Sequence, residues 1–423
     1  MMIQLNKNIV QLKPSATLAI NQEVKKLRKE GKTIYHFGFG QSPFKIHYSI
    51  TEELKKHTDN NHYLPSVGLP ALKKEISSFL SKHQGLNFNP TSIFVGPGSK
   101  ELLYQLIYLL EGIFFIPQAS WVSYVPQIKS KGASYKIIET NYSNNYKLTA
   151  EKLEKACKAN ENVQKIIILN SPNNPSGAVY TNDELKEIAS VCRVFDCIVL
   201  SDEIYSQVNF KENYSPSMAV HYPEKTIVFG GLSKVFSAGG YRLGFAAIPE
   251  TMSTMFIPLQ SFFSETFSAV SSPIQYAAIK AYQMDDELNE YINDCTQILK
   301  EISKYVYNSL EKIKIKSTYP QGAFYMLIDF EAYRNKLALL EINNAEDLCA
   351  YLLKKERIAL LPGQDFYFYN TSLTCRLAFV DFDGDKVYKS FKEKKKIDSE
   401  FMKAHVSNIY NGLIKLSAFL SKI

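Results

Sequence analysis

Three short apolar runs in the middle of the chain constrain its fold more than any other feature. Residues 165–170 (KIIILN), 197–203 (CIVLSDE) and 226–231 (TIVFGG) are rich in Ile and Val and show no alternation with polar residues. Such runs are typical of parallel strands buried on both faces. Between the first two, Thr181 and Glu184 have the spacing of a helix-starting capping box. The pattern therefore predicts an α/β fold, with helices covering a mostly parallel sheet.

Two neighbouring segments extend this sheet domain. Residues 93–95 form a short strand-like run, followed by a glycine turn and a helix expected over about 100–110. The most apolar stretch of the chain, 102–116, contains Gln105, Glu111 and Gly112. It is too short and too interrupted to span a bilayer, so a buried helix is expected there.

The C-terminal third has a different pattern. Long helical periodicity over 286–313 is followed by strand-like segments at 358–363 and 374–380, which indicates a separate α+β layer. A helix expected over 19–30 would join that layer. We therefore expect three regions: residues 1–45 as an N-terminal arm and part of the small domain, 46–285 as the large domain, and 286–423 as the C-terminal small domain.

Composition narrows the functional classes. The net charge is only +7 over 423 residues and the lysines are scattered, so no nucleic-acid partner is expected. The basic run 392–396 is interpreted as an exposed helix or loop. Six cysteines form no CxxC pair and no zinc spacing, so no metal site is expected and a reducing compartment is favoured. With no apolar signal segment visible at the N-terminus, we expect a soluble cytoplasmic protein without membrane contact.

Polar residues follow each predicted strand at its carboxyl end, where open parallel sheets bind ligands. The run 165–170 leads into Asn174, and 197–203 contains Asp202 and precedes Tyr205. The run 226–231 leads into Ser233 and Lys234, with Arg242 eight positions after the lysine. Residues 93–95 lead into Gly98, Ser99 and Lys100 at the expected start of a helix. Four strand ends would thus meet at one crevice.

The residue types at this crevice suit an anionic, planar, electron-poor ring. A helix N-terminus at Ser99 and the guanidinium of Arg242 can bind a phosphate. Asp202 can keep a ring nitrogen protonated, and Lys234 can form a Schiff base. Trp121 offers a flat stacking face. Taken singly, each has an ordinary interpretation as a cap, a turn, a surface charge or a core residue. Their conjunction at successive strand ends favours a pyridoxal 5'-phosphate (PLP) site.

The motifs that carry these residues resemble a known family. SPNNPSG (171–177), SDEIY (201–205) and LSKVFSAGGYRLG (232–244) resemble the core motifs of fold-type I PLP-dependent aminotransferases of class I/II. Residues 13–27, 37–44, 63–76, 322–327 and 375–379 extend the resemblance over nearly the whole chain. It implies PLP-transferase fold type I, in which a mostly parallel seven-stranded sheet lies between helices beside a smaller α+β domain.

The resemblance also implies roles for individual residues. Catalysis would fall to Lys234, as the Schiff-base lysine and general acid/base, together with Asp202 and Tyr205. The cofactor would contact Gly98, Ser99, Lys100, Trp121, Asn174, Asp202, Tyr205, Ser233, Lys234 and Arg242, and Tyr63 from the partner of a homodimer. The amino acid and 2-oxo acid substrates would contact Gly40, Trp121, Asn174 and Arg376, the last as an α-carboxylate fork.

One departure concerns Gly231, where the family usually places Ser or Thr. It implies either one phosphate hydrogen bond fewer, at a cost of about 1–3 kcal/mol for a charge-assisted bond, or a replacement from another residue such as Ser233.

Substrate specificity stays open at this level. The resemblance is closest to the bacterial aspartate/prephenate aminotransferase subgroup, in which a lysine at the position of Lys100 can bind a distal carboxylate. Lys100 could equally neutralise the phosphate. The segment 261–272 contains no arginine and several aromatic residues, which would suit a bulkier or apolar side chain. The alternatives to a transaminase are a C–S lyase or other lyase on the same fold, and a non-catalytic PLP-binding protein.

Overall fold

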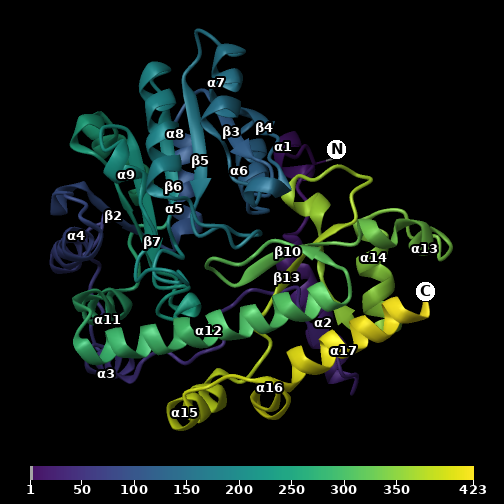
Figure 1. The fold of residues 1–423 in the computed structure, drawn as a ribbon. Coiled ribbons are helices and arrows are strands. Elements are labelled where there is room, and N and C mark those ends of the chain that lie inside the picture. Colours follow the sequence, from purple (N-terminus) through teal and green to yellow (C-terminus); the bar gives the residue numbers. More distant parts are fainter. Residues whose placement is uncertain (1–2) are drawn as a thin grey trace.

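The computed structural model describes residues 3–423 and contains a main sheet of seven strands (Figure 1). The strand order is β2-β8-β7-β6-β5-β3-β4. Only β8 runs against its neighbours β2 and β7, and the other adjacent pairs are parallel. The strands are β2 (Ile93–Gly96), β3 (Ile113–Pro117), β4 (Ser134–Ile138), β5 (Lys165–Asn170), β6 (Ile198–Asp202), β7 (Thr226–Gly231) and β8 (Gly244–Ala247). The predicted mostly parallel seven-stranded sheet is confirmed.

Helices cover both faces of this sheet, which explains the unbroken apolar runs. On one face lie α5 (Ser99–Leu109), α6 (Tyr124–Lys131) and α10 (Phe256–Ser264), and on the other α7 (Ala150–Lys158) and α8 (Asn182–Val194). In β5, Ile166 and Ile168 pack into the first layer, whereas Ile167 and Leu169 pack into the second. Because successive side chains of a strand point to opposite faces, a doubly covered strand needs apolar residues at every position.

A smaller layer lies beside the main sheet. Its antiparallel sheet has the order β12-β13-β10-β9, and a short parallel pair, β1 with β11, joins the N-terminal region to it. The strands are β1 (Tyr35–His36), β9 (Lys316–Ser317), β10 (Tyr325–Asp329), β11 (Ile358–Ala359), β12 (Leu361–Pro362) and β13 (Thr374–Ala378). The helices around it include α2 (Ala16–Lys29), α14 (Ala345–Tyr351) and α17 (Ser407–Lys422).

The long helix α12 (Asp286–Lys312) runs beneath both layers (Figure 1). Its first turns, with Leu288 and Ile292, pack with α4 (Pro70–Gln84) and α11 (Ser272–Gln283). Its remaining turns, from Cys295 onwards, pack in the core of the smaller layer. The helix therefore links the two cores, and the domain limits at 45/46 and 285/286 stay a prediction. None of the helices within residues 3–423 combines the length and apolar character needed to cross a membrane.

The buried helix predicted for residues 102–116 is wrong in its second half. Helix α5 ends at Leu109, and strand β3 begins at Ile113 after a turn. At this turn Gly112 has φ +143°, and a Cβ there would lie 2.3 Å from the carbonyl oxygen of Gln164. The stretch is apolar throughout, but its glycine adopts a backbone conformation that side chains exclude.

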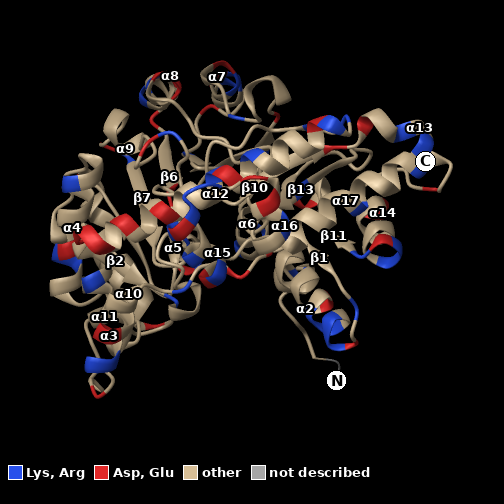
Figure 2. Cartoon of the chain, turned by 60° about the horizontal axis from the view of Figure 1, so that its bottom comes forward, with Lys and Arg blue, Asp and Glu red and all other residues tan. Residues whose placement is uncertain are grey.

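Three of the four lysines in the basic run 392–396 lie within ion-pair distance of acidic side chains. Lys392, on α15 (Gly384–Lys394), lies 2.6 Å from Glu290 and 3.0 Å from Asp294 of α12. Lys396 pairs with Asp398 at 3.3 Å. Figure 2 shows basic and acidic residues interleaved along these helices. The run supports the packing of α15 on α12 and offers no concentrated anion-binding surface.

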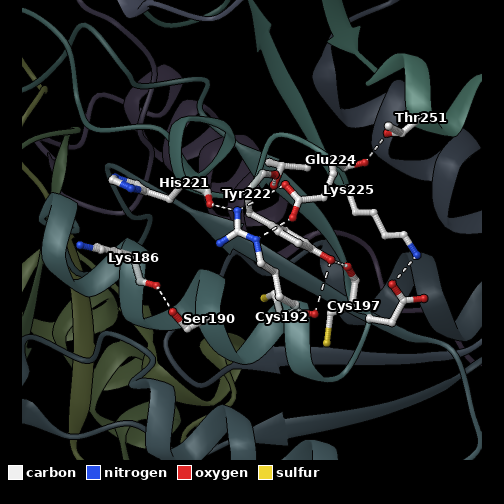
Figure 3. Close-up of polar contacts among 12 residues, drawn as sticks. Lys186, Ser190, Cys192, Cys197, His221, Tyr222, Glu224, Lys225 and Thr251 are labelled. Carbon is white, nitrogen blue, oxygen red and sulfur yellow. Dashed lines mark hydrogen bonds and ion pairs between the residues drawn. The ribbon is translucent and has the colours of Figure 1, made fainter.

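A polar network holds the beginning of β7 against α8 (Figure 3). Arg193, at the end of α8, donates to Glu224 at 2.7 Å and lies with its guanidinium 5.4 Å from the ring of Tyr222. The Tyr222 hydroxyl donates to the carbonyl of Cys197 at 2.8 Å. These contacts position β7, the strand that leads directly to Lys234.

Candidate active site

A cavity of about 460 Å³ opens at the carboxyl ends of β5, β6 and β7. Segments far apart in the sequence line it, and they carry most of the predicted site residues: Gly40, Ser99, Lys100, Trp121, Asn174, Asp202, Tyr205, Ser233, Lys234, Arg242 and Arg376. Its walls come from the strand ends of the main sheet, the N-terminal arm and strand β13. The convergence of strand ends that the sequence predicts is thus present in the structure.

Lys234 lies in the wall of this cavity with its amine engaged by backbone. Its Nζ donates to the carbonyl oxygen of Gly40 at 2.8 Å. The same amine lies 5.2 Å from the ring centroid of Tyr205 and 5.6 Å from that of Phe324. The lysine is therefore held by a single hydrogen bond beside aromatic faces, an arrangement that leaves the amine available for chemistry.

Asp202 is buried at the end of β6. It accepts hydrogen bonds from the Tyr124 hydroxyl at 2.7 Å and from the Ile204 amide at 3.4 Å. Burial raises the pKa of Asp202 to about 6, although Tyr124, Ile204 and Lys234 each oppose that rise. A cationic partner would stabilise the ionised form of such a buried carboxyl, because the attraction between the two charges offsets the free energy that burying the carboxylate requires.

The next residue, Glu203, predicts a pH-dependent stability. One of its carboxyl oxygens accepts from Ser201 and Ser217 at 2.8 and 2.7 Å. Burial raises the pKa of Glu203 from 4.5 to about 7. Between those pH values the unfolded chain releases a proton that the folded chain keeps, so this group lowers the stability of the folded state as pH rises.

Glu203→Gln should remove this dependence, because glutamine can still accept from both serines but does not ionise. Relative to the unchanged apoprotein, the variant should gain about 2–3 kcal/mol in stability between pH 5 and pH 8. Thermal unfolding at both pH values measures this, with the exposed Glu187→Gln as the matched control. An equal offset of the melting temperature at both pH values would contradict the prediction.

The N-terminus of α5 forms a second, cationic part of the site. Gly98 is the N-cap residue with φ +91°, and no side chain caps the helix. A Cβ at Gly98 would lie 2.5 Å from Nη2 of Arg242, which itself donates to the Pro97 carbonyl at 3.0 Å. Similarly, a Cβ at Gly244 would lie 2.5 Å from the amide nitrogen of Ser99. Glycines thus allow a guanidinium and uncapped amides to gather at one helix end, as anion sites require.

Arg376 forms the opposite part of the site and is completely buried. Its Nη1 donates to Asn174 Oδ1 at 3.0 Å and its Nη2 to the Gly38 carbonyl at 2.6 Å. Its Nε has no partner within the described residues. The guanidinium is oriented by two acceptors and stacked 4.4 Å from the ring of Tyr325. Such a group is a suitable fork for a carboxylate.

Lys100, the second residue of α5, also lines the cavity. Its Nζ is 5.3 Å from the ring centroid of Trp121, and burial, aided by the charge of Arg242, lowers its pKa. Ser15 and Thr17 line the same cavity, and Thr17 Oγ1 is buried without a partner among residues 3–423. In addition to Arg376, Arg242 and Lys234, the cavity therefore offers Lys100 as a further cationic side chain and two hydroxyl groups.

Several lining residues are missing from the sequence-based prediction. They are Ser15, Thr17, Leu18, Phe39, Gln41, Asn170, Ile204, Gly239, Gly240 and Tyr325, together with Tyr124 behind Asp202. Ser15 and Thr17 belong to the segment 13–27 and Tyr325 to the segment 322–327, both of which resemble the family. The family resemblance could have directed attention to these positions, but their residue types carry no distinctive chemistry.

Two predicted positions differ from the rest. Tyr63 is 94% exposed and does not line the cavity of its own chain, so its role across a dimer interface stays a prediction.

At Gly231, a Cβ would lie 2.9 Å from both the Cα of Gly244 and the carbonyl oxygen of Leu243. A serine at position 231 would therefore require β8 to shift, which accounts for the glycine in this chain.

The residues of the cavity fit PLP. A lysine amine, a buried carboxyl, an indole ring and a cationic helix N-terminus match the aldehyde, ring nitrogen, ring face and phosphate of that molecule. Within residues 3–423, no cluster of three or more His, Cys, Asp or Glu side chains could hold a metal ion.

Comparison with known proteins identifies the family. The family model for aminotransferase class I and II matches residues 32–381. The aspartate aminotransferase of Geobacillus stearothermophilus is 34% identical over 86% of this chain and 92% of that protein. The probable aspartate/prephenate aminotransferase of Aquifex aeolicus is 31% identical, over 86% and 91%. The asparagine–oxo-acid transaminase of Streptococcus mutans is 30% identical, over 86% and 92%.

Solved structures agree with this assignment at the level of the fold. The aspartate aminotransferase of Thermus thermophilus with maleate superimposes with a TM-score of 0.85 and covers 99% of this chain and 100% of its own, at 22% identity. The family model spans most of the chain, and relatives at 30–34% identity share nearly their whole length with it. The chain therefore belongs to the class I and II aminotransferases, PLP-dependent enzymes that move an amino group between amino acids and 2-oxo acids.

Proposed function

We propose that this aminotransferase prefers a dicarboxylic amino donor of the aspartate or glutamate type. The observation that carries the proposal is the pairing of two cationic side chains, Arg376 and Lys100, in one cavity. Arg376 would bind the α-carboxylate, and Lys100, with Ser15 and Thr17, would bind the distal carboxylate. The names of the relatives from Geobacillus and Aquifex support the same substrate class.

The proposed cofactor contacts follow the parts of the cavity. The phosphate would lie among Gly98, Ser99, Lys100, Ser233 and Arg242, so that Lys100 would be close to both anions. Trp121 would stack on the ring, Asp202 would pair with the ring nitrogen, and Asn174 and Tyr205 would donate hydrogen bonds to the phenolic oxygen. When bound, PLP supplies an aldehyde that links to amines and a protonated ring that withdraws electrons from the substrate.

The residues of this chain then perform the proton chemistry. Arg376 and Gly40 orient the substrate so that its Cα–H bond faces Lys234. The free amine of Lys234 would take the proton from Cα as a general base and then, as a general acid, give it to the carbon that PLP brings as its aldehyde. Asp202 stays ionised beside the cationic ring nitrogen, which stabilises the charge that develops as the proton leaves.

We further propose a homodimer in which Tyr63 reaches the phosphate site of the partner. Large apolar side chains are exposed on the described chain, including Tyr63, Ile257 at 77% and Tyr108 at 48%. Exposed aromatic and aliphatic residues of this size favour burial at a subunit interface. Light scattering would test the mass in solution, and a monomer that keeps full activity would contradict the shared site.

A cytoplasmic location is proposed from the cysteines. The sulfur atoms of Cys157 and Cys197 lie 3.9 Å apart without a disulfide bond, and all six cysteines are free thiols. Close unlinked thiols are typical of a reducing compartment.

The first experiment would add single amino acids to the PLP-loaded protein without any 2-oxo acid and follow its absorption spectrum. Aspartate, glutamate, alanine, phenylalanine, methionine and cystathionine form the panel. Conversion of the cofactor to pyridoxamine phosphate by aspartate and glutamate, well ahead of the others, is the expected result. Conversion by apolar donors alone would overturn the dicarboxylate proposal, and release of pyruvate and ammonia would indicate a lyase.

Lys100→Met tests the residue that is proposed to select the donor. The variant should lose about 10–100-fold in kcat/KM for aspartate, the scale of a hydrogen bond to a charged group. It should change much less with alanine, which has no distal carboxylate. The exposed Lys136→Met serves as the matched control. An equal loss with every donor, together with weaker PLP binding, would show that Lys100 serves the phosphate instead.

A further inference from the structure

The carbonyl oxygen of Gly40 accepts two hydrogen bonds in the active-site cavity. Lys234 Nζ donates to it at 2.8 Å, and the hydroxyl of Tyr325 donates to it at 3.2 Å. The segment that carries Gly40 is tied to the segment after Lys234, because the hydroxyls of Ser42 and Ser237 lie 2.6 Å apart. Gly40 O is therefore a fixed acceptor shared by the lysine and a tyrosine.

Tyr325 is held in one place by its neighbours. A Cβ at Gly40 would lie 2.0 Å from the Tyr325 hydroxyl oxygen, so the tyrosine fills the space that a side chain would need. The guanidinium of Arg376 covers its ring at 4.4 Å, and only 2% of the residue is exposed. The hydroxyl is 2.8 Å from the hydroxyl of Tyr205, which is equally buried.

The two tyrosine hydroxyls and Gly40 O compete for the same two protons. A tyrosine hydroxyl has one proton to donate. If Tyr325 donates to Gly40 O, then Tyr205 must donate its own proton to Tyr325. If Tyr205 is to donate into the cavity, Tyr325 is free to donate to Tyr205, and Gly40 O must rely on the amine of Lys234.

We propose that Tyr325 is a positioning residue: by giving its single proton to Gly40 O it accepts the Tyr205 proton, and so weakens the donation of Tyr205 into the cavity. Tyr325 makes this contact even while the Lys234 amine donates to the same oxygen. When that amine is engaged elsewhere, Tyr325 is the one of these two donors that Gly40 O keeps. The charged and titratable groups that face this pair are Asp202, Lys234 and Arg376. The inference rests on the proposed role of Tyr205 as a donor to the phenolic oxygen of the cofactor.

The test is a pH titration of the visible absorption of the PLP-loaded resting protein, in which Lys234 is engaged. Tyr205→Phe should raise the pH at the midpoint of this titration, since it removes a hydrogen-bond donor that stabilises the ionised phenolic oxygen of the cofactor. Tyr325→Phe should lower the midpoint by about 0.5–1 pH unit, the scale of one net hydrogen bond, since it releases the Tyr205 proton to that oxygen. In the double variant the effect of Tyr325→Phe should vanish, because it acts only through Tyr205.

Tyr222→Phe is the matched control, because its buried hydroxyl donates to the Cys197 carbonyl away from the cavity. It should leave the midpoint unchanged. The inference would be overturned if Tyr325→Phe behaved like this control, raised the midpoint, or kept its shift in the Tyr205→Phe background. If Tyr205→Phe itself has no effect, the proposed role of Tyr205 fails, which separates the two failures. Both single variants keep their aromatic rings, so the packing of Arg376 on position 325 is retained.

Discussion

Lys234→Ala should abolish transamination, with a loss in kcat of at least about 10⁴-fold. The variant lacks both the amine that links to the cofactor and the only general base that we propose for the substrate Cα. Its fold should persist, because the lysine makes a single hydrogen bond, to the Gly40 carbonyl. Steady-state assays with the preferred donor measure the loss of turnover. The visible spectrum of the PLP-loaded protein measures the loss of the link between the lysine and the cofactor.

Two companion variants sharpen this result. Lys234→Arg keeps a cation at the position but has no amine that can deprotonate near neutral pH, so it should be as inactive as the alanine variant. Lys136→Ala removes an exposed lysine and should leave kcat within about twofold. A Lys234→Ala protein that retains a tenth of the original turnover would place the essential amine elsewhere.

Asp202→Asn should lower kcat by about 10²–10⁴-fold and weaken cofactor binding. Asparagine keeps the shape of the side chain. The Tyr124 hydroxyl and the Ile204 amide bond different carboxylate oxygens, so the amide oxygen of asparagine can accept from the Ile204 amide while its amide nitrogen donates to the Tyr124 hydroxyl oxygen. Asparagine lacks the negative charge, so a protonated ring nitrogen loses its ionic partner and the developing charge on the substrate is stabilised less. Cofactor titration by fluorescence and assays at saturating PLP separate the two contributions.

The same substitution should not destabilise the apoprotein. Burial raises the pKa of Asp202 to about 6, so above that pH the ionised carboxylate lowers the stability of the folded apoprotein. Asparagine carries no such charge. Tyr124→Phe is the graded control, because it keeps the carboxylate and removes one hydrogen bond, and it should cost only about tenfold in kcat. Activity of Asp202→Asn within tenfold of the unchanged enzyme would remove Asp202 from the proposed mechanism.

Much of the large sheet could be predicted because its signals are local. Strands β5 and β7 begin and end at the predicted residues, since a doubly covered strand needs apolar residues without interruption. The capping box of α8 is present, with the Thr181 side chain bound to the Glu184 amide. Site residues such as Lys234 and Asp202 could be selected because parallel strands place their carboxyl ends along one edge.

Apolar content alone misled the prediction at 102–116. Helix α5 and strand β3 are both buried, and both read as apolar sequence, so hydrophobicity could not separate them. The boundary depends on the backbone of Gly112 and on hydrogen bonds from β3 to β4 and β5, which are set by distant residues.

Only the tertiary structure decided which common residues belong to the site. Tyr124 contacts Asp202 across 78 positions, and Tyr325 contacts Tyr205 across 120. A tyrosine or threonine in sequence carries no mark of such a partner, because long-range contacts follow from how the two layers meet. The sequence by itself thus determined the sheet and the cofactor chemistry, and it selected the lysine for which we propose the reactive role. The folded chain decided the proton-sharing around Gly40, because a hydrogen bond depends on distances of a few ångströms that spacing along the chain does not encode.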